Sequence, residues 1–178
     1  MRAVLVVLLA GLAACRIERI EPGGGARTAA VVDAADSAIV AALDRYYDRF
    51  SRRAWPEFRE SFWPGALIAT RGHPPGAGAP LVDLIPLDTF LVRTGDGPDR
   101  LAVFEEQMVH HEIRRYGDLA AVWATFRATF GVAGEAPTTH YGVDAFQLLR
   151  EGDAWRIVSL AFTTELPGDS LPKDRPAP

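Results

Sequence analysis

The sequence predicts an α+β domain whose helices lie on one face of an antiparallel sheet. Apolar residues recur at helical spacing between residues 36 and 53, and four long stretches between residues 104 and 165 are rich in β-branched and aromatic residues. Short Gly-containing segments join these stretches, so neighbouring strands must run antiparallel and form a meander. Helices followed by such a sheet are typical of the α+β class.

The first helix is expected to begin near Asp36 and Ser37, because both are good N-cap residues. Its apolar face consists of Ile39, Leu43, Tyr46, Tyr47 and Phe50. A second short helix starts at Trp55-Pro56, since proline is favoured in the first turn. Residues 66–70 form a short strand, residues 71–80 a loop, and residues 86–93 a third short helix.

The four predicted strands alternate in character along their length. In the second strand, Ala120, Val122, Ala124, Phe126, Ala128 and Phe130 form a smooth apolar face, whereas the other face carries Trp123, Thr125 and Arg127. The predicted ranges are 104–116, 119–131, 139–150 and 155–165.

Composition excludes several classes of protein. The chain has 178 residues, 48% of them hydrophobic, which indicates one folded domain plus appendages. A net charge of −4 without a basic run argues against a nucleic-acid partner. A single cysteine permits neither an internal disulfide nor a cysteine-based zinc site.

The N-terminus has the pattern of a secretory signal peptide. Met1-Arg2 precedes an apolar run over residues 3–14, too short to span a bilayer, which needs about 20 apolar residues. Leu12-Ala13-Ala14-Cys15 resembles a bacterial lipobox, so Cys15 is expected to carry the lipid of an exported, membrane-anchored envelope lipoprotein. The alternative is cleavage near Ala14 that leaves Cys15 a free thiol. We expect a signal peptide over 1–14, a tether over 15–32, a domain over 33–167 and a disordered tail over 168–178.

The order of elements resembles the nuclear transport factor 2-like fold, which includes ketosteroid isomerases and SnoaL-type polyketide cyclases. The resemblance spans residues 33–167 and depends on the amphipathic first helix, the helix-strand unit of residues 55–70, and the segments 116–120, 146–150 and 154–158. It implies a cone, with a strongly curved antiparallel sheet packed on N-terminal helices around a cavity. It also implies a homodimer through the outer face of the sheet.

The resemblance suggests two candidate catalytic residues. Tyr46 lies where the isomerases place a tyrosine that hydrogen-bonds a substrate oxyanion; the alternative is a core tyrosine. Asp144 lies near the position of the isomerases' oxyanion-hole acid and of the cyclases' catalytic Asp. If it points inward it is a candidate acid/base, and if it points outward it is a solvated or dimer-interface residue. No acid occupies residues 68–73, where the isomerases place their base, which leaves His73 as a substitute.

Other residues are candidates for binding. Tyr47, Trp63 and Trp123, with Tyr46 and Asp144, could contact a small apolar or amphipathic ligand, or the aromatic residues could simply be core. His110 and Glu112 share a strand face, but His140 lies on a strand two positions away, so a third metal ligand is hard to supply. We therefore expect neither a metal nor another cofactor.

Three functions remain open from the sequence. The first is an exported domain that binds a small apolar or amphipathic molecule without catalysis. The second is an isomerase, cyclase or dehydratase that uses Tyr46 and Asp144. The third is an envelope protein-interaction module that docks a partner or a second copy through the outer sheet face. Fold resemblance alone does not choose among them.

Overall fold

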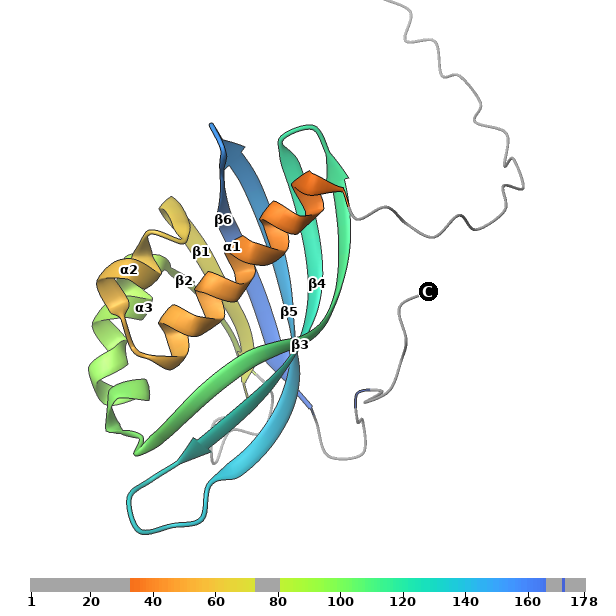
Figure 1. Cartoon of the computed structure of the whole chain (residues 1–178). Coiled ribbons are helices and arrows are strands. Elements are labelled where there is room, and N and C mark those ends of the chain that lie inside the picture. Colours follow the sequence, from red (N-terminus) through yellow and green to blue (C-terminus); the bar gives the residue numbers. More distant parts are fainter. Residues whose placement is uncertain (1–32, 73–80, 166–170, 172–178) are drawn as a thin grey trace, which may run out of the picture. The chain divides into compact units, whose positions relative to one another are not determined.

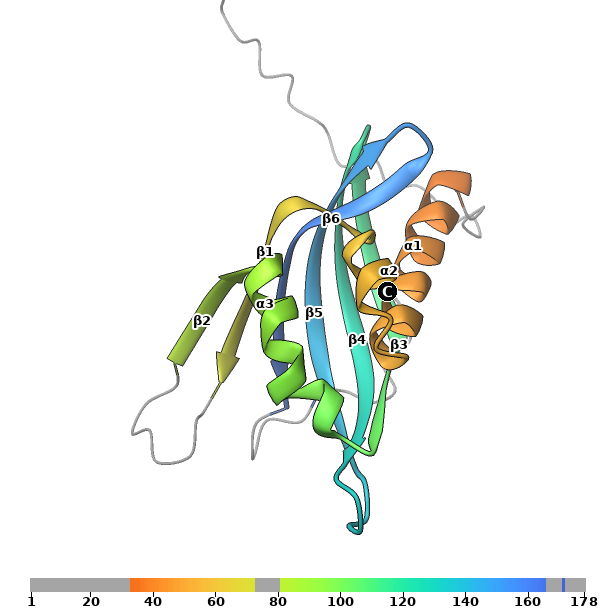
Figure 2. The same cartoon turned by 90° about the vertical axis from the view of Figure 1, so that its left-hand side faces the viewer.

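One curved six-stranded sheet holds the domain together, with helix α1 lying along its inner face (Figures 1 and 2). A computed structural model describes residues 33–72, 81–165 and 171. The helices are α1 (Ala34–Ser51), α2 (Trp55–Arg59) and α3 (Leu87–Arg93), followed by the 3₁₀ turns η1 (Thr94–Asp96) and η2 (Pro98–Arg100). The strands are β1 (Phe62–Gly72), β2 (Leu81–Pro86), β3 (Val103–Tyr116), β4 (Leu119–Gly131), β5 (Thr138–Glu151) and β6 (Ala154–Thr164). The sheet order is β2-β1-β6-β5-β4-β3, so the predicted α+β class is confirmed.

Helix α1 begins two residues before the predicted start. Asp33 is the N-cap, and its side chain accepts a hydrogen bond from the backbone N–H of Ala35 at 3.0 Å. Asp33 and Asp36 are the same good N-cap residue type, so residue type alone does not distinguish these two helix starts. The predicted apolar face is correct: its residues Ile39, Leu43, Tyr46 and Tyr47 are buried against the sheet.

The predicted meander is confirmed, since β3, β4, β5 and β6 are consecutive antiparallel neighbours. The first half of the sheet differs from the prediction. The strand expected at residues 66–70 extends over Phe62–Gly72, pairs in parallel with β6, and carries β2 as an antiparallel edge strand. Turn signals reveal only pairings between consecutive strands, so the parallel β1–β6 pairing and β2 were missed.

The inner face of the sheet carries the core. The apolar set predicted on β4 faces α1, and its Ala120, Val122, Ala124, Phe126 and Ala128 are almost completely buried. Phe146 and Leu148 on β5 and Ile157 and Leu160 on β6 pack on the same side. Burying each such large apolar side chain contributes about 1.5–3 kcal/mol, so this face is the main source of stability.

Strand β3 changes its facing residues part-way along. Met108 lies opposite Phe126 and His110 opposite Thr125, so Val109 falls out of register. Before this bulge the even-numbered residues, among them Phe104 and Met108, face α1; after it the odd-numbered ones do. A bulge of this kind adds one residue to one strand and thereby reverses the alternation.

The predicted signal peptide, tether and most of the predicted tail lie outside the described residues. Within the part of the chain that is described, no helix is both long and apolar enough to cross a membrane.

Candidate acid/base site

A cavity of about 300 Å³ lies between α1 and the inner face of the sheet. Its walls are mainly aromatic, and its two acidic groups are Glu106 on β3 and Asp144 on β5. The aromatic lining residues are Tyr46, Phe50, Phe58, Phe90, Phe104, Phe126, Phe130 and Phe162. Volume and lining are typical of a site for a small, largely apolar molecule with one polar group.

Asp144 points inward, into the cavity. Its register partners on the two neighbouring strands are Ala124, which is completely buried, and Phe162, which lines the cavity. The side chain of Asp144 is 2% exposed. The sequence left the facing of Asp144 open, because a register slip of one residue would have turned it outward.

The hydroxyl of Tyr47 donates a hydrogen bond of 2.5 Å to Oδ2 of Asp144. Burial raises the pKa of Asp144 to about 7, and the hydrogen bond from Tyr47 opposes that rise because it favours the carboxylate. Burial also raises the pKa of Tyr47 well above its ordinary value, so Tyr47 stays a proton donor. At neutral pH, both the protonated and the carboxylate form of Asp144 are therefore populated.

Glu106 is the second acid of the cavity, and sequence reasoning missed it. The hydroxyl of Ser51, the last residue of α1, donates to the carbonyl oxygen of Glu106 at 2.9 Å and accepts from its N–H at 2.8 Å. These bonds fix the backbone of Glu106 on an edge strand. Burial, and then the charge of Asp144, raise the pKa of Glu106 well above its usual range. The two carboxyl groups therefore lie close enough to influence each other's ionisation.

Tyr46 lines the cavity beside the acid pair. Its ring packs edge-on against Tyr47 at 4.9 Å and Phe146 at 5.2 Å between ring centroids. Burial, followed by the charges of Asp144 and Glu106, raises the pKa of Tyr46, so its hydroxyl is neutral. The tyrosine that hydrogen-bonds Asp144 is Tyr47, and Tyr46 contributes a ring and a hydroxyl to the wall.

Arg53 holds one part of the cavity wall in place. It has a left-handed backbone (φ 55°), and its guanidinium donates to the carbonyl oxygens of Pro98 at 3.0 Å and Leu101 at 2.6 Å. The same guanidinium lies 5.1 Å from the ring centre of Phe104. Since Pro98 and Leu101 line the cavity, these bonds fix that part of its wall.

The other predicted binding residues lie elsewhere. Trp123 is 55% exposed on the outer face of the sheet, because its neighbours on β4, Val122 and Ala124, occupy the inner face. Trp63 is not among the residues that line the cavity. His73 lies outside the described residues. Within those that are described, no three His, Cys, Asp or Glu side chains are grouped to hold a metal ion.

Comparison with known proteins agrees with this architecture. The family model of the SnoaL-like domain matches residues 34–161. The chain belongs to the SnoaL-like family. No curated protein matches the sequence itself.

Solved structures similar to this SnoaL-like domain share its fold at low sequence identity. A putative scytalone dehydratase from Novosphingobium aromaticivorans has a TM-score of 0.60 at 14% identity, covering 73% of this chain and 83% of its own. A protein from Kribbella flavida has a TM-score of 0.58 at 19% identity, covering 73% and 90%. A hexachlorocyclohexane dehydrochlorinase from Novosphingobium barchaimii has a TM-score of 0.57 at 11% identity, covering 73% and 86%. These likenesses show the nuclear transport factor 2-like fold that the sequence predicts.

Proposed function

We propose that this SnoaL-like domain is an acid/base enzyme that moves a proton on a small, largely apolar substrate, in an isomerisation or an elimination. The observation that carries the proposal is the hydrogen bond from Tyr47 to Asp144 in an apolar cavity that also holds Glu106. Asp144 titrates near neutrality, where a general base works best. Two acids whose environments differ can divide the roles of proton acceptor and of partner for the polar group of the substrate.

In this proposal, the carboxylate of Asp144 takes a proton from a substrate carbon, and Glu106 holds the polar atom of the substrate. As the C–H bond breaks, its electron pair forms a new double bond to the neighbouring carbon. In an elimination, the bond from that neighbouring carbon to the departing group breaks, and the group leaves with its electron pair and takes the proton from Asp144. In an isomerisation, an existing double bond shifts along the substrate, and Asp144 returns the proton to the carbon at its far end. Tyr47 orients Asp144 and stabilises its charged form. The aromatic walls exclude water, which strengthens both interactions.

Deuterium exchange tests the proposal without knowledge of the natural substrate. Indan-2-one is a small apolar ketone with acidic protons beside its carbonyl group. Incubated with the protein in D₂O, it is expected to exchange these protons faster than in buffer alone, as followed by proton NMR. Binding of the ketone without faster exchange would instead support the alternative, a binding protein that performs no reaction.

We also propose that the chain is exported and anchored in the bacterial envelope through Cys15. The apolar run that ends in Leu12-Ala13-Ala14-Cys15 supports the proposal. The acyl chains of a lipoprotein contribute about 0.8 kcal/mol per buried methylene, so several of them hold a protein firmly in the membrane. The variant Cys15→Ser is expected to move the protein from the membrane fraction to the soluble fraction. Unchanged fractionation would refute the anchor.

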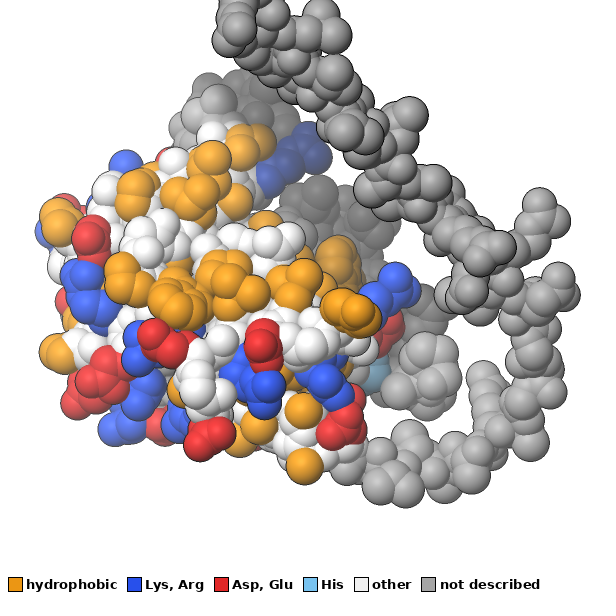
Figure 3. Space-filling view, turned by 90° about the horizontal axis from the view of Figure 1, so that it is seen from above, with side chains coloured by type: hydrophobic (Ala, Val, Ile, Leu, Met, Phe, Trp, Pro, Cys, Tyr) orange, Lys and Arg blue, Asp and Glu red, His pale blue; other side chains and the backbone are white. Residues whose placement is uncertain are grey.

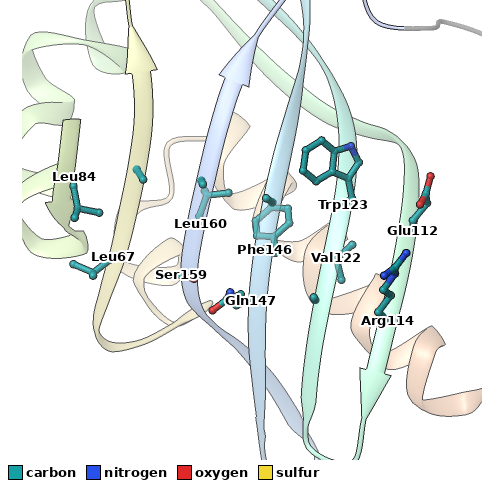
Figure 4. Close-up of a pocket in the computed structure, with 14 residues that line it drawn as sticks. Leu67, Leu84, Glu112, Arg114, Val122, Trp123, Phe146, Gln147, Ser159 and Leu160 are labelled. Carbon is teal, nitrogen blue, oxygen red and sulfur yellow. The ribbon is translucent and has the colours of Figure 1, made fainter. Parts of the chain in front are cut away.

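A third proposal concerns the outer face of the sheet, which we propose pairs two copies of the chain. Figure 3 looks at the domain from above, not onto this face: hydrophobic side chains form a band across that end, and most of the charged side chains, of both signs, lie below the band. The outer face itself holds a depression of about 620 Å³ between Trp123 and Leu84 (Figure 4). Its floor is a row of small residues: Ala145 lies opposite Trp123, and Ala161 lies opposite both Ala145 and Ala69.

The exposed Trp123 and the alanine floor beside it suit a two-fold interface, in which the tryptophan of each copy enters the depression of the other. The variant Trp123→Glu is expected to convert a dimer into a monomer in analytical ultracentrifugation, because it would bury a charge without a partner. Val92→Glu, which changes an exposed apolar residue of α3, is the matched control and should leave the dimer intact. A monomeric wild-type protein at high micromolar concentration would contradict the proposal.

A further inference from the structure

Among the described residues that line the cavity, the acidic side chains have no basic counterpart. The described lining includes two carboxyl groups, Glu106 and Asp144, and no Lys, Arg or His. The guanidinium of Arg53 lies 5.1 Å from the ring centre of Phe104, but it already donates to the carbonyl oxygens of Pro98 and Leu101. The described lining therefore offers two acids, hydroxyl groups and aromatic rings, but no Lys, Arg or His of its own.

The two acids differ in their partners. Asp144 accepts the hydrogen bond from Tyr47. The carboxyl group of Glu106 makes no hydrogen bond or ion pair with the described residues, although Ser51 holds its backbone through two hydrogen bonds. Glu106 is partly buried, and a carboxyl group that has lost part of its water without gaining a partner costs free energy, so a ligand that supplies the partner recovers it.

Aromatic rings surround this unpartnered acid. Phe104, two residues before Glu106 on the same face of β3, stacks on Phe130 at 5.0 Å between ring centroids. The ring centroid of Phe50 lies 4.8 Å from that of Phe104, and the Arg53 guanidinium lies 5.1 Å from the same Phe104 ring. Ring faces carry partial negative charge and attract cations, most strongly where water is excluded.

We propose that the substrate or ligand of this cavity carries a cationic nitrogen, a protonated amine on a small ring system, which pairs with the carboxylate of Glu106 against Phe104 and Phe130. This deepens the proposed function, on which it rests, by naming the polar group that Glu106 holds. Asp144 and Tyr47 stay free for proton transfer. Burial raises the pKa of Glu106, and an ammonium group beside it lowers that pKa again, so binding of the cation is expected to be accompanied by release of protons to solvent.

Two probes of the same shape test the proposal. Indan-2-amine is protonated at neutral pH, and indan-2-ol replaces its ammonium group by a neutral hydroxyl. In isothermal titration calorimetry of the wild-type protein, the amine is expected to bind at least about tenfold more tightly than the alcohol. Titration in two buffers of different ionisation enthalpy should show release of protons with the amine and none with the alcohol.

The variant Glu106→Gln is expected to abolish this preference while the alcohol still binds. Glu105→Gln is the matched control, since Glu105 is the exposed neighbour on the opposite face of β3 and its loss should change nothing. Equal or weaker binding of the amine by the wild-type protein, or a preference that survives in a folded Glu106→Gln variant, would overturn the proposal.

The remaining outcomes separate this inference from the proposed function. Binding of the alcohol with catalysed exchange of indan-2-one, but no preference for the amine, overturns only the cationic ligand. Binding of neither probe, with no exchange, overturns both. If Glu106→Gln does not fold, two measurements on the wild-type protein still test the cationic ligand: the ratio of its affinities for the amine and the alcohol, and the proton release on binding the amine.

Discussion

Replacing Asp144 by asparagine is expected to lower the rate of catalysed exchange of indan-2-one by about 10²–10⁴-fold, the usual contribution of a general base. Asparagine has nearly the size of aspartate and still accepts a hydrogen bond from Tyr47, but it cannot take up a proton. The rate is measured by proton NMR in D₂O, with the free energy of unfolding measured in parallel. An unchanged rate in a folded Asp144→Asn variant would remove Asp144 from the mechanism.

Two further variants separate catalysis from positioning. Tyr47→Phe removes the hydroxyl that favours the carboxylate of Asp144, so the pKa of Asp144 rises further and the pH profile of exchange moves to higher pH. The maximal rate should fall less than in Asp144→Asn. Ser159→Ala, on the outer face of the sheet, is the control and should retain the wild-type rate. A pH profile that does not move in Tyr47→Phe would contradict the role assigned to Tyr47.

The stability of the domain is expected to fall as the pH rises from about 4 to about 7. Asp144 has a pKa of about 7 in the folded protein against 3.8 as its ordinary value, so between these limits the folded state binds more protons than the unfolded state. Folding is then favoured at the acidic end, and this contribution is lost as Asp144 ionises. Each unit of pKa corresponds to about 1.4 kcal/mol, so the loss amounts to a few kcal/mol.

Urea unfolding of the wild-type protein and of Asp144→Asn at about pH 5 and about pH 8 measures this effect. The wild-type protein should lose stability between the two conditions, and the variant should lose distinctly less. The remaining slope of the variant is expected to shrink further in the double variant with Glu106→Gln, because the pKa of Glu106 is raised in the same direction. Equal slopes in all three proteins would show that Asp144 is ionised in the folded state.

The local pattern of the sequence predicted the main parts of the fold. The spacing of Ile39, Leu43, Tyr46 and Tyr47 located the buried face of α1, and alternation along β4 identified its inner face. Both work because helical and extended chains have fixed periods of side-chain direction. The parallel pairing of β1 with β6 joins segments far apart in the chain, so no turn residue indicated it.

The sequence predicted only part of the candidate site. Asp144 and both tyrosines were recognised, but which tyrosine bonds Asp144 depends on the rotation of α1 over the sheet, which the spacing of adjacent residues does not determine. Glu106 was missed for a different reason. From Ile113, which faces α1, a regular strand would place Glu105 inward and Glu106 outward, and only the bulge at Val109 reverses them. No residue in the run Met108-Val109-His110 signals a bulge.

Because of that bulge, the number of residues in β3 determines which of its side chains face the cavity. The two ends of β3 are anchored separately, by Ser51 at Glu106 and by the ion pairs of Arg115 with Asp33 and Asp36. Between these anchors, one residue more or fewer would exchange the cavity-facing and solvent-facing sets without altering any side chain near the site. Relatives of this domain can therefore acquire or lose an acid in the cavity through a single-codon insertion or deletion. Aligning such sequences without gaps in this strand would pair residues that point in opposite directions.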